Sequence, residues 1–212
     1  MKYTITTGDC ADISTDCLVV GVYSGYQLTP TAKAVDQSTG GLLKRLAKRG
    51  DIEGTSGRTL LLPCEYDLRA PRLLVVGLGD VAALDADEFL AVARSTATAL
   101  QRTGAKNAVV TLAEAKVKQR DLGDRARIIV EAFAISRYRF DSLKSKKSKS
   151  KNRNLSAIVL PVRRKSSVTA VRRSVREGEA ISSGIQLACD LANLPGNICT
   201  PSYLAKEARK LQ

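Results

Sequence analysis

The sequence contains no histidine and no tryptophan among its 212 residues, and aromatic residues make up only 4% of it. Without histidine the chain has no Ser-His-Asp or Cys-His catalytic group, and it lacks the side chain that most often binds zinc. Few rings are available to stack on bases or sugars, which disfavours recognition by stacking. Any metal site would therefore have to be built from carboxylates, and the acidic residues are scattered among turns and helix starts.

Paired cysteines, long apolar runs and a leader pattern are also missing. The five cysteines form no CxxC pair, so we expect free, mostly buried thiols in a reducing compartment. No run approaches the roughly 18 apolar residues that are needed to span a bilayer. The opening residues, MKYTITTGDCADIS, lack the basic patch and the apolar stretch of a signal peptide. The sequence predicts a cytoplasmic protein with no membrane partner.

The net charge of +13 is confined to one part of the chain. Residues 137–176 hold 14 Lys and Arg against a single acid, Asp141, whereas the remaining residues are neutral overall. The densest part, 144–153, contains no apolar residue and predicts a solvated surface loop. Lysine density of this kind gives weak, salt-dependent binding to nucleic acid, so DNA stays open as a partner. The candidate contact residues are Lys144, Lys146, Lys147, Lys149, Lys151, Arg163, Arg164, Arg172 and Arg173.

Strand-like runs alternate with helical patterns through the first 160 residues, which predicts a three-layer α/β domain. The middle runs are continuously apolar and β-branched, as is typical of strands covered on both faces. Because the first two strands are joined too closely for a helical crossover, we expect a mixed sheet. The expected strands are 3–6, 17–22, 59–63, 72–78, 108–112 and 155–161. The expected helices are 31–49, interrupted at Gly40-Gly41, then 86–102, opened by a capping box at Asp85 and Glu88, and 119–138.

A long helical pattern follows Pro161. Apolar residues from Val168 to Ala192 predict one helix of about 25 residues, near 37 Å long, which favours a connector between two bodies. A further helix is expected after Thr200-Pro201, an N-cap followed by proline at the first helical position. No segment of the chain is left to cover its apolar face, so we expect a truncated chain. That face consists of Tyr203, Leu204, Ala208 and Leu211.

Two glycine-rich strings invite a phosphate-binding interpretation. GLGDVA at 77–82 matches a loose dinucleotide-binding turn, but no acid stands at the ribose position and the helix begins several residues later. We interpret it as a tight turn after a strand. GTSGR at 54–58 lacks the Lys-Ser/Thr ending of a P-loop, and we interpret it as a flexible connection.

Two longer strings carry a resemblance to a known family. In YRFDSLKSKK the matching residues are Tyr138, Phe140, Asp141, Lys144 and Lys146. In LACDLANLPGNICTPSYLAKEARKL they are Asp190, Leu191, Asn193, Pro195, Asn197, Thr200 and Pro201. With VVGLG at 75–79 and REGEAISSGIQLA at 176–188, this order and spacing resembles the cytosolic leucyl aminopeptidases. Gly196 and Cys189 depart from the family pattern.

The resemblance implies a macro-domain-like domain at 1–161, an interdomain linking helix at 162–194, and the start of a truncated catalytic domain at 195–212. It implies a peptidase that removes N-terminal residues with two divalent ions, zinc or manganese, held by Asp, Glu and Lys. The motifs that carry those ligands do not occur in this sequence, so the chain receives no catalytic residue, no metal ligand and no cofactor. Asp141, a lone acid, is interpreted as an ion-pairing residue, and Asn193 and Asn197 as turn residues between the domains.

Three functions remain open from the sequence. The first is the assembly and regulatory domain of an aminopeptidase, with its own catalytic domain and a homohexamer as partners and peptides as substrates of the parent protein. The second is a nucleic-acid-binding module that acts through residues 137–176, because some bacterial relatives also bind DNA. The third is a binder of ADP-ribose or another nucleotide through the macro-like fold.

Overall fold

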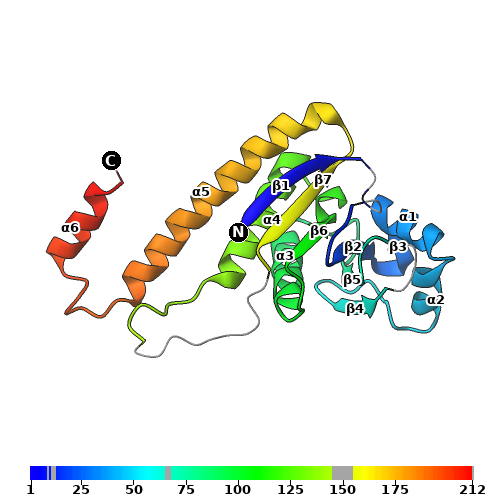
Figure 1. The fold of residues 1–212 in the computed structure, drawn as a ribbon, viewed down its shortest axis with the longest axis horizontal. Coiled ribbons are helices and arrows are strands. Elements are labelled where there is room, and N and C mark those ends of the chain that lie inside the picture. The colour runs from blue at the N-terminus through cyan, green and yellow to red at the C-terminus, as the bar shows by residue number, and fades with distance from the viewer. Residues whose placement is uncertain (9, 11–12, 65–67, 145–154, 212) are drawn as a thin grey trace.

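The protein is seen here in a computed structural model, which describes residues 1–8, 10, 13–64, 68–144 and 155–211. Within these residues seven strands form one sheet in the order β1-β7-β6-β2-β5-β4, and β3 pairs with β2 outside this path (Figure 1). The strands are β1 (Lys2–Thr7), β2 (Leu18–Tyr23), β3 (Gln27–Leu28), β4 (Thr59–Pro63), β5 (Arg72–Gly77), β6 (Asn107–Val110) and β7 (Ala157–Val162).

The sheet is mixed, as predicted, although the expected reason was wrong. β1 and β2 are not neighbours, because β1 lies at one edge of the sheet and runs parallel to β7. The antiparallel members are β3, which pairs with β2, and β4, which pairs with β5 at the other edge. Every residue of β2 is buried, which explains the uninterrupted apolar run in its sequence.

Helices cover both faces of the sheet. On one face lie α1 (Pro30–Ser38) and α2 (Leu42–Lys48), and on the other α3 (Ala86–Gln101), α4 (Leu122–Arg137) and α5 (Val168–Asn193). The predicted break at Gly40-Gly41 is confirmed: these residues have φ values of 63° and 82°, which an L side chain rarely adopts. Asp85 caps α3 by accepting from the Glu88 amide at 2.9 Å, as the sequence indicated. Short 3-10 helices span Ser24–Tyr26, Leu112–Glu114 and Lys165–Ser167.

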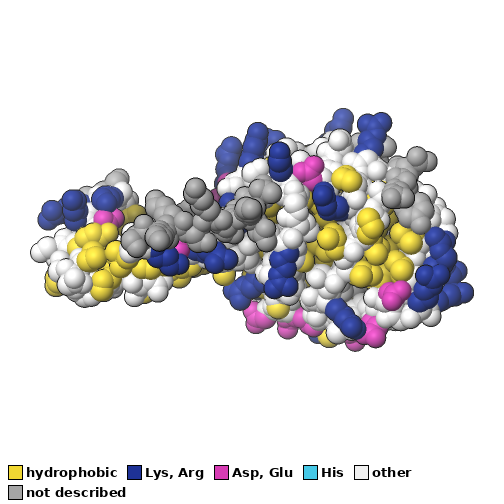
Figure 2. Space-filling model, turned by 60° about the horizontal axis from the view of Figure 1, so that its bottom comes forward, with side chains coloured by type: hydrophobic (Ala, Val, Ile, Leu, Met, Phe, Trp, Pro, Cys, Tyr) yellow, Lys and Arg dark blue, Asp and Glu magenta, His cyan; other side chains and the backbone are white. Residues whose placement is uncertain are grey.

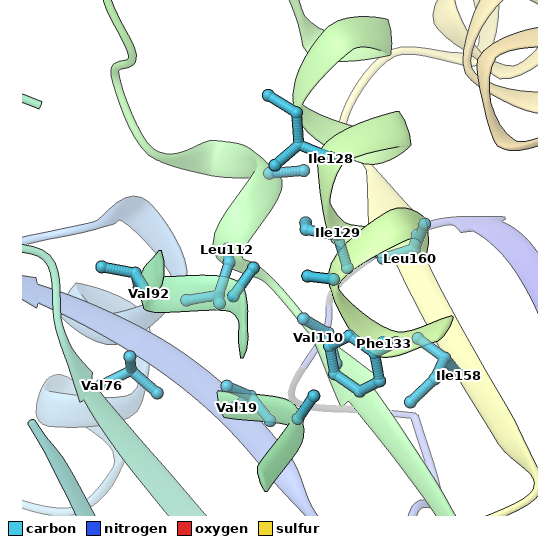
Figure 3. Close-up of a cluster of buried hydrophobic side chains, with 14 of the residues drawn as sticks. Val19, Val76, Val92, Val110, Leu112, Ile128, Ile129, Phe133, Ile158 and Leu160 are labelled. Atoms are coloured by element: carbon cyan, nitrogen blue, oxygen red, sulfur yellow. The ribbon is translucent and has the colours of Figure 1, made fainter. Parts of the chain in front are cut away.

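Alternate side chains of the strands divide the core into two clusters, which makes the fold three-layered as predicted. Val19 and Val76 face the α3–α4–α5 layer, and their neighbours Val20 and Val75 face the α1–α2 layer. In the larger cluster, side chains of α4 lie against β6 and β7 (Figure 3). The fully buried side chains at this contact are Ile129, Phe133, Val110 and Ile158.

The predicted long helix is present as α5, which spans 26 residues. Its first half packs on the sheet, where Val171 and Val175 are 1% and 4% exposed. Its second half extends beyond the sheet and leads to α6 (Pro201–Arg209) at the far left of Figure 1. Ile181 and Ile185 in this half are 40% and 38% exposed, and α6 has no buried residue. We call Ile181–Leu211 the projecting arm.

Candidate functional site

The two strings that carried the family resemblance meet at the junction between α4 and the projecting arm. The chain leaves α4 in an extended conformation at Tyr138, whose φ and ψ are −58° and 133°. The Tyr138 hydroxyl donates to Oδ1 of Asp190 at 2.8 Å, and Nδ2 of Asn193 donates to the Tyr138 hydroxyl at 3.2 Å. Asn193 also donates to the Cys189 carbonyl at 2.8 Å. These contacts attach the segment after α4 to the last two turns of α5, 52 residues further along the chain.

A cavity of about 440 Å³ lies beside this junction, between the start of β1, the end of α4 and the middle of α5. Tyr3 forms part of its wall, and burial raises the pKa of the Tyr3 hydroxyl, with a further increase from the charge of Glu179 and an opposing effect of Arg137. The hydroxyl therefore stays protonated at neutral pH. No pattern along the chain indicates this cavity, because its walls come from three elements that are distant in sequence.

The candidate nucleic-acid contacts do not form one surface among the described residues. Lys146, Lys147, Lys149 and Lys151 lie outside the described part of the chain. Lys144 pairs with Asp141 at 2.6 Å, which agrees with the interpretation of Asp141 as an ion-pairing residue. Lys144 follows α4 and the Tyr138 segment, which is bonded to the end of α5 through Asp190, whereas Arg163, Arg164, Arg172 and Arg173 lie around the start of α5.

Two of the four arginines near the start of α5 are held by carboxylates. Arg163 donates from Nε to Glu114 at 3.4 Å, and Arg173 donates to Glu177 at 2.9 Å within α5. Arg164 and Arg172 are exposed and have no ion pair with any residue that the structure describes. Exposed arginines of this kind can meet phosphate, and the described candidate contacts lie in two places, Lys144 beyond α4 and the arginines around the start of α5.

The carboxyl ends of β2 and β5 form the edge at which open α/β sheets commonly bind ligands. Here the loop at 54–58 fills that edge with backbone. The Gly57 amide donates to the Gly77 carbonyl at 2.9 Å, and the Gly79 amide donates to the Gly54 carbonyl at 2.8 Å. The expectation of a flexible connection at 54–58 was therefore wrong, because main-chain hydrogen bonds fix this loop against the next strand. The interpretation of 77–82 as a tight turn after a strand is confirmed.

The amino terminus of α1, a potential anion site, is occupied by a side chain of the protein itself. Oε2 of Glu114 accepts from the Thr31 amide at 2.9 Å, and the side chain of Glu114 is only 10% exposed. A carboxylate at a helix amino terminus is stabilised by the unpaired amides there. Sequence reasoning did not single out Glu114, since its partner lies 83 residues away in the chain.

Metal ligands and membrane spans were also sought in the described residues. In that part of the chain, no three His, Cys, Asp or Glu side chains are grouped so that they could hold a metal ion. None of the described helices combines the length and apolar character required to cross a membrane.

Comparison with known proteins gives a consistent result. Residues 19–147 match the N-terminal domain of the cytosol aminopeptidase family. Over 211 residues the chain is 38% identical to a probable cytosol aminopeptidase of Alkalilimnicola ehrlichii and 37% identical to one of Nitrosococcus oceani. All of the chain is covered in both alignments, but it spans only 42% of the length of these relatives.

Two solved structures share the fold. A mutant of tomato leucine aminopeptidase aligns with a TM-score of 0.76 and 22% identity, over 99% of this chain and 41% of that one. The bottromycin maturation enzyme BotP aligns with a TM-score of 0.67 and 25% identity, over 93% of this chain and 37% of that one.

Proposed function

Since the chain belongs to the cytosol aminopeptidase family, as its N-terminal domain, we propose that it positions the catalytic part of an aminopeptidase through the projecting arm. The three-layer domain supplies a rigid base, and the first half of α5 is packed on that base. The second half carries the chain outward to the point where the family's longer relatives continue. In this proposal residues 162–194 link two domains, and 195–212 begin the catalytic one.

The observation that supports this proposal is the apolar surface of the arm. Figure 2 shows hydrophobic side chains along the arm as it extends from the body. Large exposed apolar residues lie on both of its helices and on the turn between them, and contiguous exposure of this kind marks an association site. The residues concerned are Ile181, Ile185, Ile198, Leu204 and Leu211, of which Leu211 is 73% exposed.

The chemistry of the parent protein is assigned to residues outside this chain. The family resemblance implies two divalent metal ions, which polarise the scissile carbonyl and activate water when they are bound. The described residues do not fit such a centre, because no group of suitable side chains occurs among them. We therefore assign this chain no catalytic step. Its proposed roles are to orient the arm and to take part in a cytoplasmic homo-oligomer, a hexamer in the family.

The nucleotide-binding alternative has less support. Pyrophosphate binding in α/β folds uses a glycine-rich turn and a helix amino terminus. Here the 54–58 loop packs against Gly77 and Gly79, and Glu114 already occupies the amino terminus of α1. A neighbouring cavity of about 220 Å³ has Asp51, Glu53 and Arg58 in its wall, and Arg58 is paired with Glu53 at 2.6 Å rather than left for a phosphate.

The proposal is tested by fusing residues 1–212 to the remaining part of the Alkalilimnicola relative and measuring metal-dependent hydrolysis of a leucyl amide. We expect activity from the fusion and none from the 212-residue chain alone with added manganese or zinc. Leu204→Asp should lower the activity and the oligomeric mass of the fusion, because it places a charge on the apolar face of α6. Ser202→Asp, on the same helix, is the matched control and should leave both unchanged. Metal-dependent, heat-labile hydrolysis by the purified chain alone would contradict the proposal.

A further inference from the structure

The cavity beside Tyr3 has the size of a small-molecule site and a polar wall. Its volume of about 440 Å³ lies in the range of roughly 300 to 1,000 Å³ that is typical of ligand pockets. The apolar contact residues proposed for the arm, Ile181, Ile185, Ile198, Leu204 and Leu211, do not form the wall of this cavity. The arm contributes other residues to that wall, namely Ser182, Ser183, Gln186 and Asp190. The inference below does not rest on the proposed function.

Charges of both signs face the cavity without protein partners. The guanidinium of Arg139 and the carboxylate of Glu179 both belong to its wall. Neither makes a hydrogen bond or ion pair with a side chain in the described part of the molecule. Gln186, which lies between them on the wall, also has no side-chain partner among those residues. Unpaired polar groups that converge on one hollow are available to a ligand.

The opposite charges are arranged around one neutral group. Tyr3, Glu179 and Arg137 all form part of the cavity wall, and the charge of Glu179 raises the pKa of the Tyr3 hydroxyl whereas that of Arg137 lowers it. Arg137 also donates to the Leu155 carbonyl at 2.9 Å, which fixes its side chain. A ligand with only negative charge would meet Glu179, and one with only positive charge would meet Arg137 and Arg139. The cavity therefore favours a ligand that carries both charges at separate ends.

We propose that this cavity binds a short peptide with free ends, whose carboxylate lies at Arg139 and whose ammonium group lies at Glu179. Charge-assisted hydrogen bonds of this kind are stronger than neutral ones. Gln186 donates to or accepts from the peptide backbone between the two ends, and the Tyr3 hydroxyl, which donates to the Val130 carbonyl at 3.4 Å, accepts from it. No covalent step is involved.

The length of the ligand follows from the geometry of α5. Arg139 is next to Tyr138, which is attached to Asp190, and Glu179 lies eleven residues before Asp190 on the same helix. That interval is about 16 Å along the helix axis. An extended peptide of three residues spans about 10 Å, and the long side chains of Arg139 and Glu179 close the rest. We therefore expect a single amino acid, whose two charges lie closer together, to bind more weakly.

The test is a calorimetric titration of the 212-residue chain at low salt with trialanine, N-acetyl-trialanine, trialanine amide and free alanine. Trialanine should bind with a Kd of about 1 mM, as expected for a few half-exposed charged contacts. Blocking either end should weaken binding about tenfold, because it removes one charge-assisted hydrogen bond. Free alanine should bind at least as weakly as the blocked peptides.

Two variants test which residue binds each end of the peptide. Arg139→Gln should bind trialanine and its amide equally, because the carboxylate has lost its partner. Glu179→Gln should bind trialanine and its N-acetyl form equally. Both residues are on the surface, so circular dichroism should show an unchanged fold. The single variants Arg164→Gln and Glu177→Gln change charges outside the cavity and serve as controls. The proposal is overturned if trialanine fails to bind at about 10 mM, or if the end-blocked peptides bind as tightly as the free one. Equal loss of affinity for all ligands in both variants would overturn it as well.

Discussion

Single residues in this protein act mainly through contacts that are remote in sequence. Glu114 caps a helix 83 residues away, and Tyr138 holds an aspartate 52 residues further on. Gly77 is another example: an added Cβ would lie 1.9 Å from the carbonyl oxygen of Thr55, which belongs to the loop packed against it. Backbone cannot move aside as a flexible side chain can, so this glycine is required by close approach.

Gly77→Ala should therefore destabilise the domain by about 3 kcal/mol, at the upper end of the cost of overpacking. Gly184 supplies the control, because it lies in α5 with nothing within 4 Å of an added Cβ. Gly184→Ala should raise stability by up to about 1 kcal/mol through helix propensity. Urea denaturation of the three proteins measures both effects. Equal stability of the two variants would mean that the 54–58 loop moves away from β5.

The buried thiol of Cys17 predicts a loss of stability at alkaline pH. Burial raises the pKa of Cys17 from 9.0 to about 12, and the nearby charge of Asp16 adds to the increase against an opposing effect of Arg72. The folded state thus favours the neutral thiol. This contribution is complete below pH 9.0 and is lost as the pH rises toward 12.

Cys17→Ala should flatten the fall of the unfolding free energy above pH 9, by up to about 1.4 kcal/mol per pH unit. The measurement is urea denaturation at several pH values from 8 to about 10.5, below the folded-state pKa. Val19→Ala, on β2 two residues after Cys17, removes buried atoms without a titrating group and should lower stability equally at every pH. Parallel curves for the Cys17→Ala protein and the parent would contradict the assignment to this thiol.

At the scale of elements, α5 has two halves with different environments. Val175 in the first half is 4% exposed and contacts the main core, whereas Ile185 in the second half is 38% exposed. Both positions belong to the apolar pattern that predicted one helix connecting two bodies, and this pattern does not show where burial ends. In the structure burial on α5 extends as far as Ser182, beyond the contact of Gly178 with Val130 of α4.

Deleting Ile198–Gln212 should leave the melting temperature of the α/β domain almost unchanged, because α6 contributes no buried residue. Truncating a side chain should likewise lower stability in the packed first half of α5 and have little effect in its exposed second half. Val175→Ala should cost about 2 kcal/mol, and Ile185→Ala less than about 0.5 kcal/mol. Differential scanning calorimetry gives the comparison. A drop of many degrees on deletion would show that α6 folds back on the domain.

At the scale of the whole molecule, the described candidate basic residues lie near the two ends of α5, and residues 145–154 lie outside the described part of the chain. Three of the candidate basic residues have carboxylate partners, namely Lys144, Arg163 and Arg173. Ion pairs on the surface are weak and do not remove these side chains from phosphate altogether. They do lower the net charge that a phosphate backbone would meet at each end.

Binding to duplex DNA, where it occurs, should be weak and sequence-indifferent, and it should be lost between about 50 and 200 mM salt. Replacing Lys144, Lys146, Lys147, Lys149 and Lys151 with Gln should remove most of it and reduce the slope of log K against log salt. The arginines near the start of α5 provide the comparison: Arg164→Gln with Arg172→Gln should have the smaller effect. Fluorescence anisotropy with two unrelated duplexes is the measurement. Binding that survives 200 mM salt or distinguishes the duplexes would contradict this expectation.

Four features follow from the amino-acid sequence alone: the class of fold, the break between α1 and α2, the long helix and the family. Each of these depends on local patterns, because apolar periodicity, Asp85 as a cap and the glycines at 40 and 41 act on neighbours in the chain. The two aminopeptidase-like strings were recognisable for the same reason.

Three other features are visible only in the tertiary structure. They are the order of the strands, the packing of the 54–58 loop against β5, and the cavity beside Tyr3. β1 pairs with β7, 155 residues later in register, and no short-range pattern encodes that choice. The contact between Glu114 and Thr31 and the charges around the Tyr3 cavity likewise bring together residues from separate elements. Their positions follow from the order in which the strands join the sheet and from the packing of helices on both of its faces. A pattern along the chain does not specify either.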